Sequence, residues 1–175
     1  MLIYDRRTGE KILEIPGDTL AGRDLREHDL KYADLDGLDL SLCNFSGIDL
    51  EGAQFSNCNL SDAIFTGCNL SEAIFTRANA PRSLFNRTTL SITAFSHATL
   101  EEADFSEIVV AGMVNFRWIV AHRSKFRNIK NLSGANFFEA DLTNAECEGS
   151  DFTQVNESDR TGTILKGTSF EYLME

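Results

Sequence analysis

Residues 53–77 have the sequence AQFSN CNLSD AIFTG CNLSE AIFTR, which is one five-residue pattern repeated five times. The pattern extends in both directions: from Leu20 to Val110, seventeen of the nineteen residues at every fifth position are Leu or Phe. A period of five matches neither the 3.6-residue period of an α-helix nor the two-residue period of a flat strand. Each unit must therefore be one short extended piece followed by a corner.

The residues around each Leu or Phe alternate in character. Two residues earlier stands a small or apolar residue, and the residue between the two is polar in most units. Alternation in an extended segment sends the two apolar side chains to one side and the middle one to the other. We therefore expect an interior filled by Leu and Phe, with smaller residues beside them. These inward residues include Ala33, Leu38, Cys43, Ile48, Ala53, Cys58, Ala63, Cys68, Ala73 and Ala78.

Three stretches that lie in phase carry a family resemblance: ADLDG at 33–37, CNLSE at 68–72 and ADLTN at 140–144. They resemble the A(D/N)LXX unit of pentapeptide repeat proteins, and the resemblance covers roughly residues 18–157. It implies an all-β fold, a right-handed quadrilateral β-helix of about seven coils. In that fold four pentapeptides make one coil, and no ligand cavity is enclosed.

The central residues sort into four columns when every fourth unit is compared. Leu dominates two columns and Phe the other two, and the two kinds alternate around the coil. Rings stacked above rings, with Leu columns between them, are what four-sided stacking requires. The Phe-rich columns begin Leu25, Phe45, Phe65, Phe85, Phe105 and Leu35, Phe55, Phe75, Phe95.

The pattern predicts three parts of the chain. We expect a β-hairpin cap over 1–17, the β-helix over 18–157, and a loop with a displaced last coil or cap over 158–175. Single-residue slips before Phe116 and before Leu132 predict bulges at corners. Residues 153–164 break the pattern and predict a loop, and residues 169–174 are expected to cover the last coil.

The oligomeric state is expected to be a monomer or a weak homodimer. Many family members that act on DNA topoisomerases carry a longer apolar C-terminal module that pairs two subunits, and this sequence has no convincing version of it. Solenoids also need capped ends, because a bare end coil exposes core and strand edges.

Composition excludes several classes of protein. The chain has 175 residues, of which 27 are acidic and 16 basic, and its net charge is −11. A protein that binds the phosphate backbone should be basic, so direct nucleic-acid binding is not expected. No apolar run approaches the length of a membrane-spanning helix, and no signal-peptide pattern follows Met1. We therefore expect a cytoplasmic protein without a membrane partner.

Catalytic and metal-binding patterns are missing from the sequence. Cys43, Cys58, Cys68 and Cys147 occupy inward positions, which predicts buried, reduced thiols. No C-x-x-C pair, H-E-x-x-H, Gly-x-Ser-x-Gly or phosphate-binding loop occurs. The sequence predicts no enzyme, no catalytic residue, no cofactor and no metal site.

Two features of the middle coils suggest an interaction surface. Residues 77–130 carry a net charge of +4 between segments of −8 and −7. The outward position, usually Asp or Asn, becomes apolar in several of these units, and contiguous exposed apolar residues can mark an interface. The alternatives are a solvated surface for the charges and packing under corner side chains for the apolar residues. The candidate surface comprises Ile64, Ile74, Leu84, Arg77, Arg82 and Arg87.

Two functions remain. The first is a non-enzymatic protein-interaction or scaffold solenoid with an unknown partner, since solenoids present extended surfaces. The second comes from the resemblance: some family members mimic DNA and bind, modulate or protect a type II topoisomerase such as gyrase. Seven coils at roughly 4.8 Å span about 34 Å. Net charge −11 over that length is about 0.3 charge per Å, against about 0.6 for B-DNA. We rank the interaction solenoid first.

Overall fold

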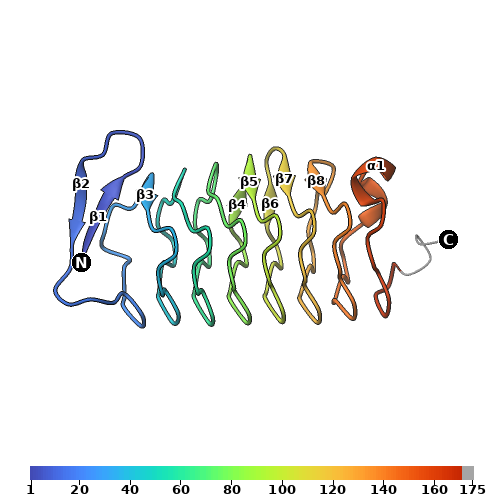
Figure 1. Ribbon diagram of the computed structural model, residues 1–175. Coiled ribbons are helices and arrows are strands. Elements are labelled where there is room, and N and C mark those ends of the chain that lie inside the picture. Colours follow the sequence, from blue (N-terminus) through green and yellow to red (C-terminus); the bar gives the residue numbers. More distant parts are fainter. Residues whose placement is uncertain (171–175) are drawn as a thin grey trace.

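Short extended segments stack in parallel, one coil above the next, and form four ladders along the axis (Figure 1). The computed structural model describes residues 1–170. Backbone partners lie 20 residues apart in the first part of the chain, as in the bridge between Asn44 and Ile64, and 21 or more after the slips. Four units of five residues therefore make one coil, and the fold is a right-handed quadrilateral β-helix.

Each ladder defines one face, and we number the faces in the order in which the chain meets them. The outward residues of the first face are Asp39, Asn59, Asn79, Thr99, Val120, Asp141 and Ile164; those of the second are Asp24, Asn44, Ile64, Leu84, Asp104, Lys125 and Glu146. Those of the third are Asp49, Asn69, Thr89 and Val109; those of the fourth are Asp34, Gln54, Ile74, Ala94, Asn115 and Asn136. The second and fourth faces are on opposite sides of the coil.

We call each extended segment of a ladder a rung. Few rungs are long enough to count as strands. The hairpin strands are β1 (Leu2–Asp5) and β2 (Lys11–Glu14), and the two-residue strands of the coils are β3 (Ala33–Asp34), β4 (Thr89–Leu90), β5 (Thr93–Ala94), β6 (Val109–Val110), β7 (Val114–Asn115) and β8 (Ala135–Asn136). The helices are the 3₁₀ turn η1 (Phe152–Gln154) and α1 (Glu157–Arg160). A corner every five residues explains the short strands.

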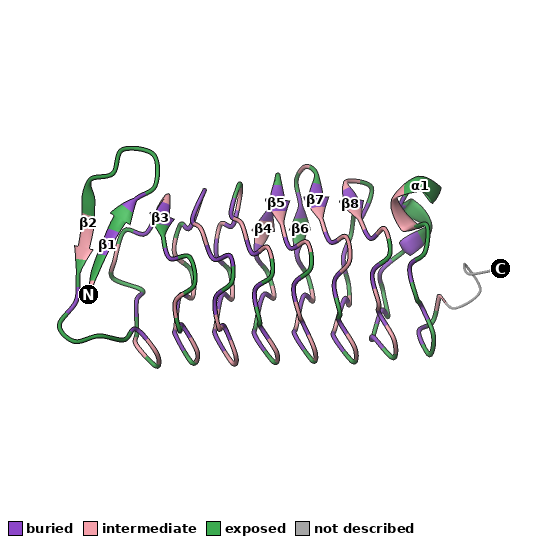
Figure 2. Cartoon of the chain, viewed as in Figure 1, coloured by how far each residue is buried: buried purple, intermediate pink, exposed green. Residues whose placement is uncertain are grey.

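The core consists of stacked rings, as the column pattern predicts. Phe65 stacks on Phe85 with ring centroids 4.9 Å apart and planes within 2°. The second and fourth faces also meet inside the coil, where Phe55 and Phe65 touch edge to face at 5.4 Å and 89°. Such offset and edge-to-face contacts are the favourable arrangements of aromatic pairs. The predicted segregation of Phe and Leu into alternating columns is confirmed, and buried residues recur in every coil (Figure 2).

Both one-residue slips fall at corners. The first lies in Ala111–Met113, between β6 and β7, and the second beside Asn131. The pairing of Val114 with Ala135 shows that the ladder resumes after each slip. A Cβ atom at Gly134 would collide with the carbonyl oxygen of Gly112, so the two widened corners stack closely only because Gly134 has no side chain.

The N-terminal hairpin covers the first coil. Strand β1 pairs antiparallel with β2 on one side and with β3 on the other, so the sheet order is β2-β1-β3. Arg23, an unusual inward residue in the first coil, donates from Nη2 to the Pro16 carbonyl at 2.6 Å and from Nε to the Thr19 carbonyl at 3.0 Å. The segment that joins the hairpin to the first coil therefore supplies hydrogen-bond acceptors for the Arg23 guanidinium.

The C-terminal end differs from the sequence expectation. Residues 153–164 are not a plain loop, because they contain most of η1 and all of α1. Helix α1 takes the place of a fourth-face rung: the Phe137 and Glu139 amides donate to the Asp159 and Thr161 carbonyls at 2.6 and 2.9 Å. The coil then resumes where Ile164 pairs with Asp141. Of the segment expected to cover the last coil, residues 171–174 lie outside the described residues.

Candidate interaction surface

The four thiols are buried and free, as the sequence predicts. The Sγ atoms of Cys58 and Cys68 donate to backbone carbonyls at 3.0 and 2.9 Å. Burial raises the pKa of Cys58 to about 12, that of Cys68 to about 11 and that of Cys147 to about 12. Thiols that stay protonated at neutral pH are poor nucleophiles and poor metal ligands. Within residues 1–170, no group of three or more His, Cys, Asp or Glu residues could hold a metal ion.

The structure divides the six candidate surface residues between two opposite faces. Ile64 and Leu84 are adjacent rungs of the second face, and Arg82 and Arg87 stand at its two edges. Arg82 makes a bidentate contact with Asp62, at 2.8 and 2.7 Å, and Arg87 pairs with Glu107 at 3.0 Å. The charges of Arg82 and Arg87 are therefore matched by carboxylates of neighbouring coils. The remaining two candidates, Ile74 and Arg77, lie on and beside the fourth face.

The fourth face carries a shallow hollow that the sequence analysis missed. Its volume is about 550 Å³, and it is open to solvent. Ile92 and Met113, on successive coils, form its apolar rim and are 60% and 74% exposed. Its lining comes from β5, β7, β8 and α1 and from the corners beside them, and these elements follow one another along the chain in Figure 1. We call it the fourth-face hollow; it is lined by Ile92, Thr93, Ala94, Met113, Val114, Asn115, Arg117, Ser133, Gly134, Asn136, Asn156 and Asp159.

A stack of rings and a guanidinium lies beside the hollow. Trp118 stacks on His97 with centroids 4.7 Å apart, and its indole Nε1 donates to Glu139 at 2.8 Å. The Arg117 guanidinium lies over the Trp118 ring at 4.2 Å and over the Phe138 ring at 4.9 Å. We call His97, Arg117, Trp118 and Phe138 the fourth-face cluster. It holds a cation by ring contacts, not by a carboxylate.

The bases of the middle coils differ in their partners. Arg82, Arg87, Arg123 and Arg127 each lie within 4.0 Å of a carboxylate. In the described part of the chain, Arg77, Arg117, Lys125 and Lys130 have no such ion pair. The Nε atom of Arg117 is also buried without a hydrogen-bond partner. An unmatched buried donor of this kind costs about 1–3 kcal/mol, so the fourth face holds the least satisfied cation of the set.

Backbone conformation marks a few corners as unusual. Seventeen residues other than glycine have positive φ, and each stands at a corner, two residues after a central position. Asn, Asp and charged residues dominate this set, but it includes the bulky residues Tyr32, Leu42, Ile92 and Trp118. A β-branched or bulky side chain is a true outlier there, because its Cβ meets the neighbouring carbonyl. Ile92 and Trp118 border the fourth face, whereas Leu42 lies between the first and second faces.

The sequence did not predict the hollow, because its two apolar rim residues do not stand at outward positions of the repeat. Ile92 occupies a corner position, and Met113 lies inside the first slip, where the register is ambiguous. The signal was present: Ile92 is an isoleucine where equivalent corners carry Asn57, Asp62 or Arg77.

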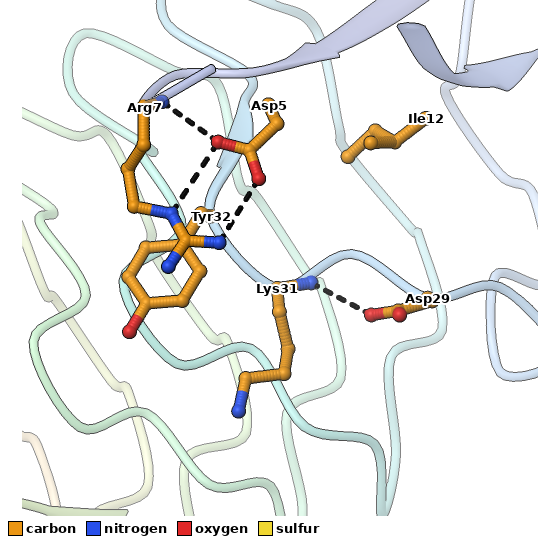
Figure 3. Close-up of a pocket in the computed structure, with 6 residues that line it drawn as sticks. All are labelled: Asp5, Arg7, Ile12, Asp29, Lys31 and Tyr32. Atoms are coloured by element: carbon orange, nitrogen blue, oxygen red, sulfur yellow. Dashed lines mark hydrogen bonds and ion pairs between the residues drawn. The ribbon is translucent and has the colours of Figure 1, made fainter. Parts of the chain in front are cut away.

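A second concavity lies between the N-terminal hairpin and the first coils (Figure 3). Its volume is about 490 Å³. Arg7 stacks over the Tyr32 ring at 3.2 Å and pairs with Asp5 at 3.1 Å, while Lys31 pairs with Glu51 at 3.0 Å. Hydrogen bonds from Arg7 hold the pKa of the Asp5 carboxyl below its usual value. These groups satisfy one another and join the cap to the helix.

Comparison with known proteins supports the architecture. The family model for pentapeptide repeats matches residues 19–47, 53–91 and 131–156 in eight copies, which is more than half of the chain. The chain belongs to the pentapeptide repeat family. A comparison with curated proteins found no significant match. Among the helices of residues 1–170, none is long and apolar enough to cross a membrane.

Solved structures of the same family resemble the chain at low identity. One is QnrB1, described as a plasmid-mediated fluoroquinolone resistance protein, at 23% identity over 73% of this chain and 76% of that one, with a TM-score of 0.39. Another is Rfr23 from the cyanobacterium Cyanothece 51142, at 16% identity over 77% and 85%, with a TM-score of 0.40. HetL from Nostoc sp. strain PCC 7120, involved in heterocyst differentiation regulation, shares 22% identity over 86% and 81%, with a TM-score of 0.24.

Proposed function

We propose that this protein is a non-enzymatic, cytoplasmic interaction solenoid that binds another protein through the fourth face of its middle coils. The observation that carries the proposal is the coincidence on one face of exposed apolar side chains, an open hollow and a cation without a carboxylate partner. Exposed apolar groups beside an Arg held by aromatic rings are typical of protein interfaces.

The opposite face supports this choice by contrast. Ile64 and Leu84 are also apolar, but Leu84 is only 37% exposed, and Arg82 and Arg87 at its edges are neutralised by ion pairs within the chain. A charge that is already paired offers a partner little further attraction. The second face is therefore our alternative surface, and it supplies a matched control.

The experiment is a pull-down from native cytosol with three baits. They are the wild-type chain, the variant Ile92→Asp/Met113→Asp on the fourth face, and the variant Ile64→Asp/Leu84→Asp on the second. Each variant adds two carboxylates on successive coils, so both carry similar charge repulsion. We expect a partner that is retained by the wild type and the second-face variant and lost by the fourth-face variant. Loss with the second-face variant alone would move the site to the other face.

A second candidate function comes from the family resemblance, since QnrB1 is a fluoroquinolone resistance protein. A DNA mimic that binds a type II topoisomerase needs a continuous acidic stripe. Here residues 77–130 are net positive, and apolar residues replace carboxylates on the second and fourth faces. Steered binding to a basic groove falls steeply with salt, whereas an apolar contact does not.

Supercoiling by purified gyrase, with and without this protein, at low and moderate salt, separates the two functions. We expect no effect. Salt-sensitive inhibition or drug protection at micromolar protein would reverse the ranking.

A further inference from the structure

We infer that the fourth-face hollow binds an extended peptide segment of a partner protein, one that places an apolar side chain between Ile92 and Met113 and a carboxylate side chain on Arg117. This inference rests on the proposed function and names the chemistry of the partner. Three observations support it: the state of Arg117, the shape of the hollow, and the strain at its rim.

Arg117 is organised to receive an anion. Its guanidinium lies over the rings of Trp118 and Phe138, at 4.2 and 4.9 Å, and it has no ion pair with any described carboxylate. Its Nε atom is buried without a hydrogen-bond partner, and Arg117 is one of the residues that line the hollow. A planar fork that is already fixed loses little entropy when it pairs with a carboxylate.

Charge favours an acidic segment beside Arg117 over the acidic ends of the chain. The chain carries −11 overall, so a carboxylate is repelled by most of the surface. Arg77, on the same edge of the fourth face two coils before Arg117, is the next cation without an ion pair. One carboxylate, that of Asp159, lies at the other end of the hollow, where it already accepts a hydrogen bond from Asn136 at 2.8 Å. The acidic residue of the ligand therefore lies toward Arg77 and Arg117.

The hollow has the length of a short peptide. Its lining spans the rungs from Ile92 to Asn156 on four successive coils, or about three rises of 4.8 Å. That distance, about 14 Å, accommodates about four residues of extended chain. The side-chain Oδ1 of Asn115 accepts from the Arg117 amide at 3.0 Å, which leaves its Nδ2 free to donate to a passing peptide carbonyl.

The rim stores backbone strain that the fold does not need. Ile92 has φ 56° and a side chain that is 60% exposed, so it gives the folded chain little burial in return. Many equivalent corners use residues that suit this conformation, such as Asn57 and Asn128; Leu42, at φ 60° and likewise exposed, is an exception that lies away from the hollow. Strained positions that persist without a structural benefit cluster at binding sites.

The test uses a displayed library of short random peptides, selected on the wild-type chain in the presence of excess Ile92→Asp/Met113→Asp protein as competitor. Trp118 is the chain's single tryptophan, so its fluorescence reports occupancy directly. We expect enriched peptides that pair an Asp or Glu with a large apolar residue. Amidation of that acidic side chain should weaken binding about tenfold to the wild type and leave binding to Arg117→Gln unchanged. Ile64→Asp/Leu84→Asp, the matched control, should bind like the wild type.

Each outcome decides the inference. No enrichment over the competitor, enrichment of basic peptides, or equal effects of amidation on the wild type and Arg117→Gln would overturn it. The proposed function fails separately, when no native partner depends on either face in the pull-down. A native partner that depends on the second face, with no peptide selected on the fourth, would refute the inference and leave an interaction solenoid.

Discussion

The residues at the corners of the coils determine much of the surface of this protein. Gly, Asn, Asp or a charged residue stands at most corners, and these residues suit the left-handed conformation found there. That preference does not explain Leu42, Ile92 or Trp118, whose positive φ values become visible only in three dimensions. The pairing of Arg82 with Asp62, twenty residues away, likewise depends on the number of residues per coil. Counting charges along the sequence therefore overestimated the free positive charge.

Replacing Ile92 by Asn should stabilise the protein. Asn tolerates the left-handed conformation, and the exposed isoleucine side chain gives up little buried area. We expect the free energy of unfolding to rise by about 1 kcal/mol, and the melting temperature by about 2–4 °C. A thermal melt measures this. Asn57→Ile, the reverse change at an equivalent corner, is the control and should destabilise; a lower melting temperature for Ile92→Asn would show that its side chain supports the fold.

The buried thiols should make stability fall at high pH. Burial raises the pKa of Cys58 to about 12 and that of Cys68 to about 11, whereas an unfolded thiol has a pKa of about 8.5. The contribution of each protonated thiol to stability is complete below the pKa of the unfolded state. It declines as the pH rises toward the pKa of the folded state. By pH 10 each thiol should have cost about 2 kcal/mol of stability relative to pH 8.

Urea denaturation at pH 8 and pH 10 measures that loss. The control is Cys58→Ala/Cys68→Ala, since alanine occupies the same inward position at Ala63 and Ala73. The variant should lose less stability than the wild type over this range. Equal losses would mean that other groups cause the effect.

At the scale of elements, one coil unit is too short to be stable alone and depends on its neighbours above and below. The Phe columns were predictable because their period survives both slips. Helix α1 was not, because four polar residues, Glu157–Arg160, carry no helical periodicity of their own. Their conformation follows from their place on the last coil, where the Asp159 carbonyl accepts from Phe137 and the carbonyl of the next residue after the helix, Thr161, accepts from Glu139.

Ring stacking should matter more at the centre of the columns than at their ends. Phe95 stacks on Phe75 at 4.7 Å and on Phe116 at 5.2 Å, whereas Phe170 is partly exposed and meets Phe152 at 5.4 Å in a tilted contact. We expect Phe95→Ala to cost about 3–5 kcal/mol and Phe170→Ala much less. Equal shifts in melting temperature for the two variants would contradict the column model.

Charge is distributed unevenly along the whole molecule. Both ends are acidic, and the middle coils carry an apolar and cationic face. Periodicity predicted the architecture, because the type of each inward residue depends on its place in the five-residue unit. It predicted only part of the surface, since Ile74 and Arg77 lie with the fourth face while Ile64, Leu84 and their arginine neighbours lie opposite. Outward residues are under no periodic constraint, so their grouping depends on the coil geometry and on where the slips fall.

Amide hydrogen exchange of this chain, alone and with the partner captured from cytosol, tests the binding account most directly. We expect slower exchange in the complex at 92–97 and 113–118, the rungs that carry the hollow and the fourth-face cluster, and unchanged exchange at 62–67 and 82–87 on the second face. Protection confined to 62–67 and 82–87 would contradict the assignment of the fourth face as the binding surface.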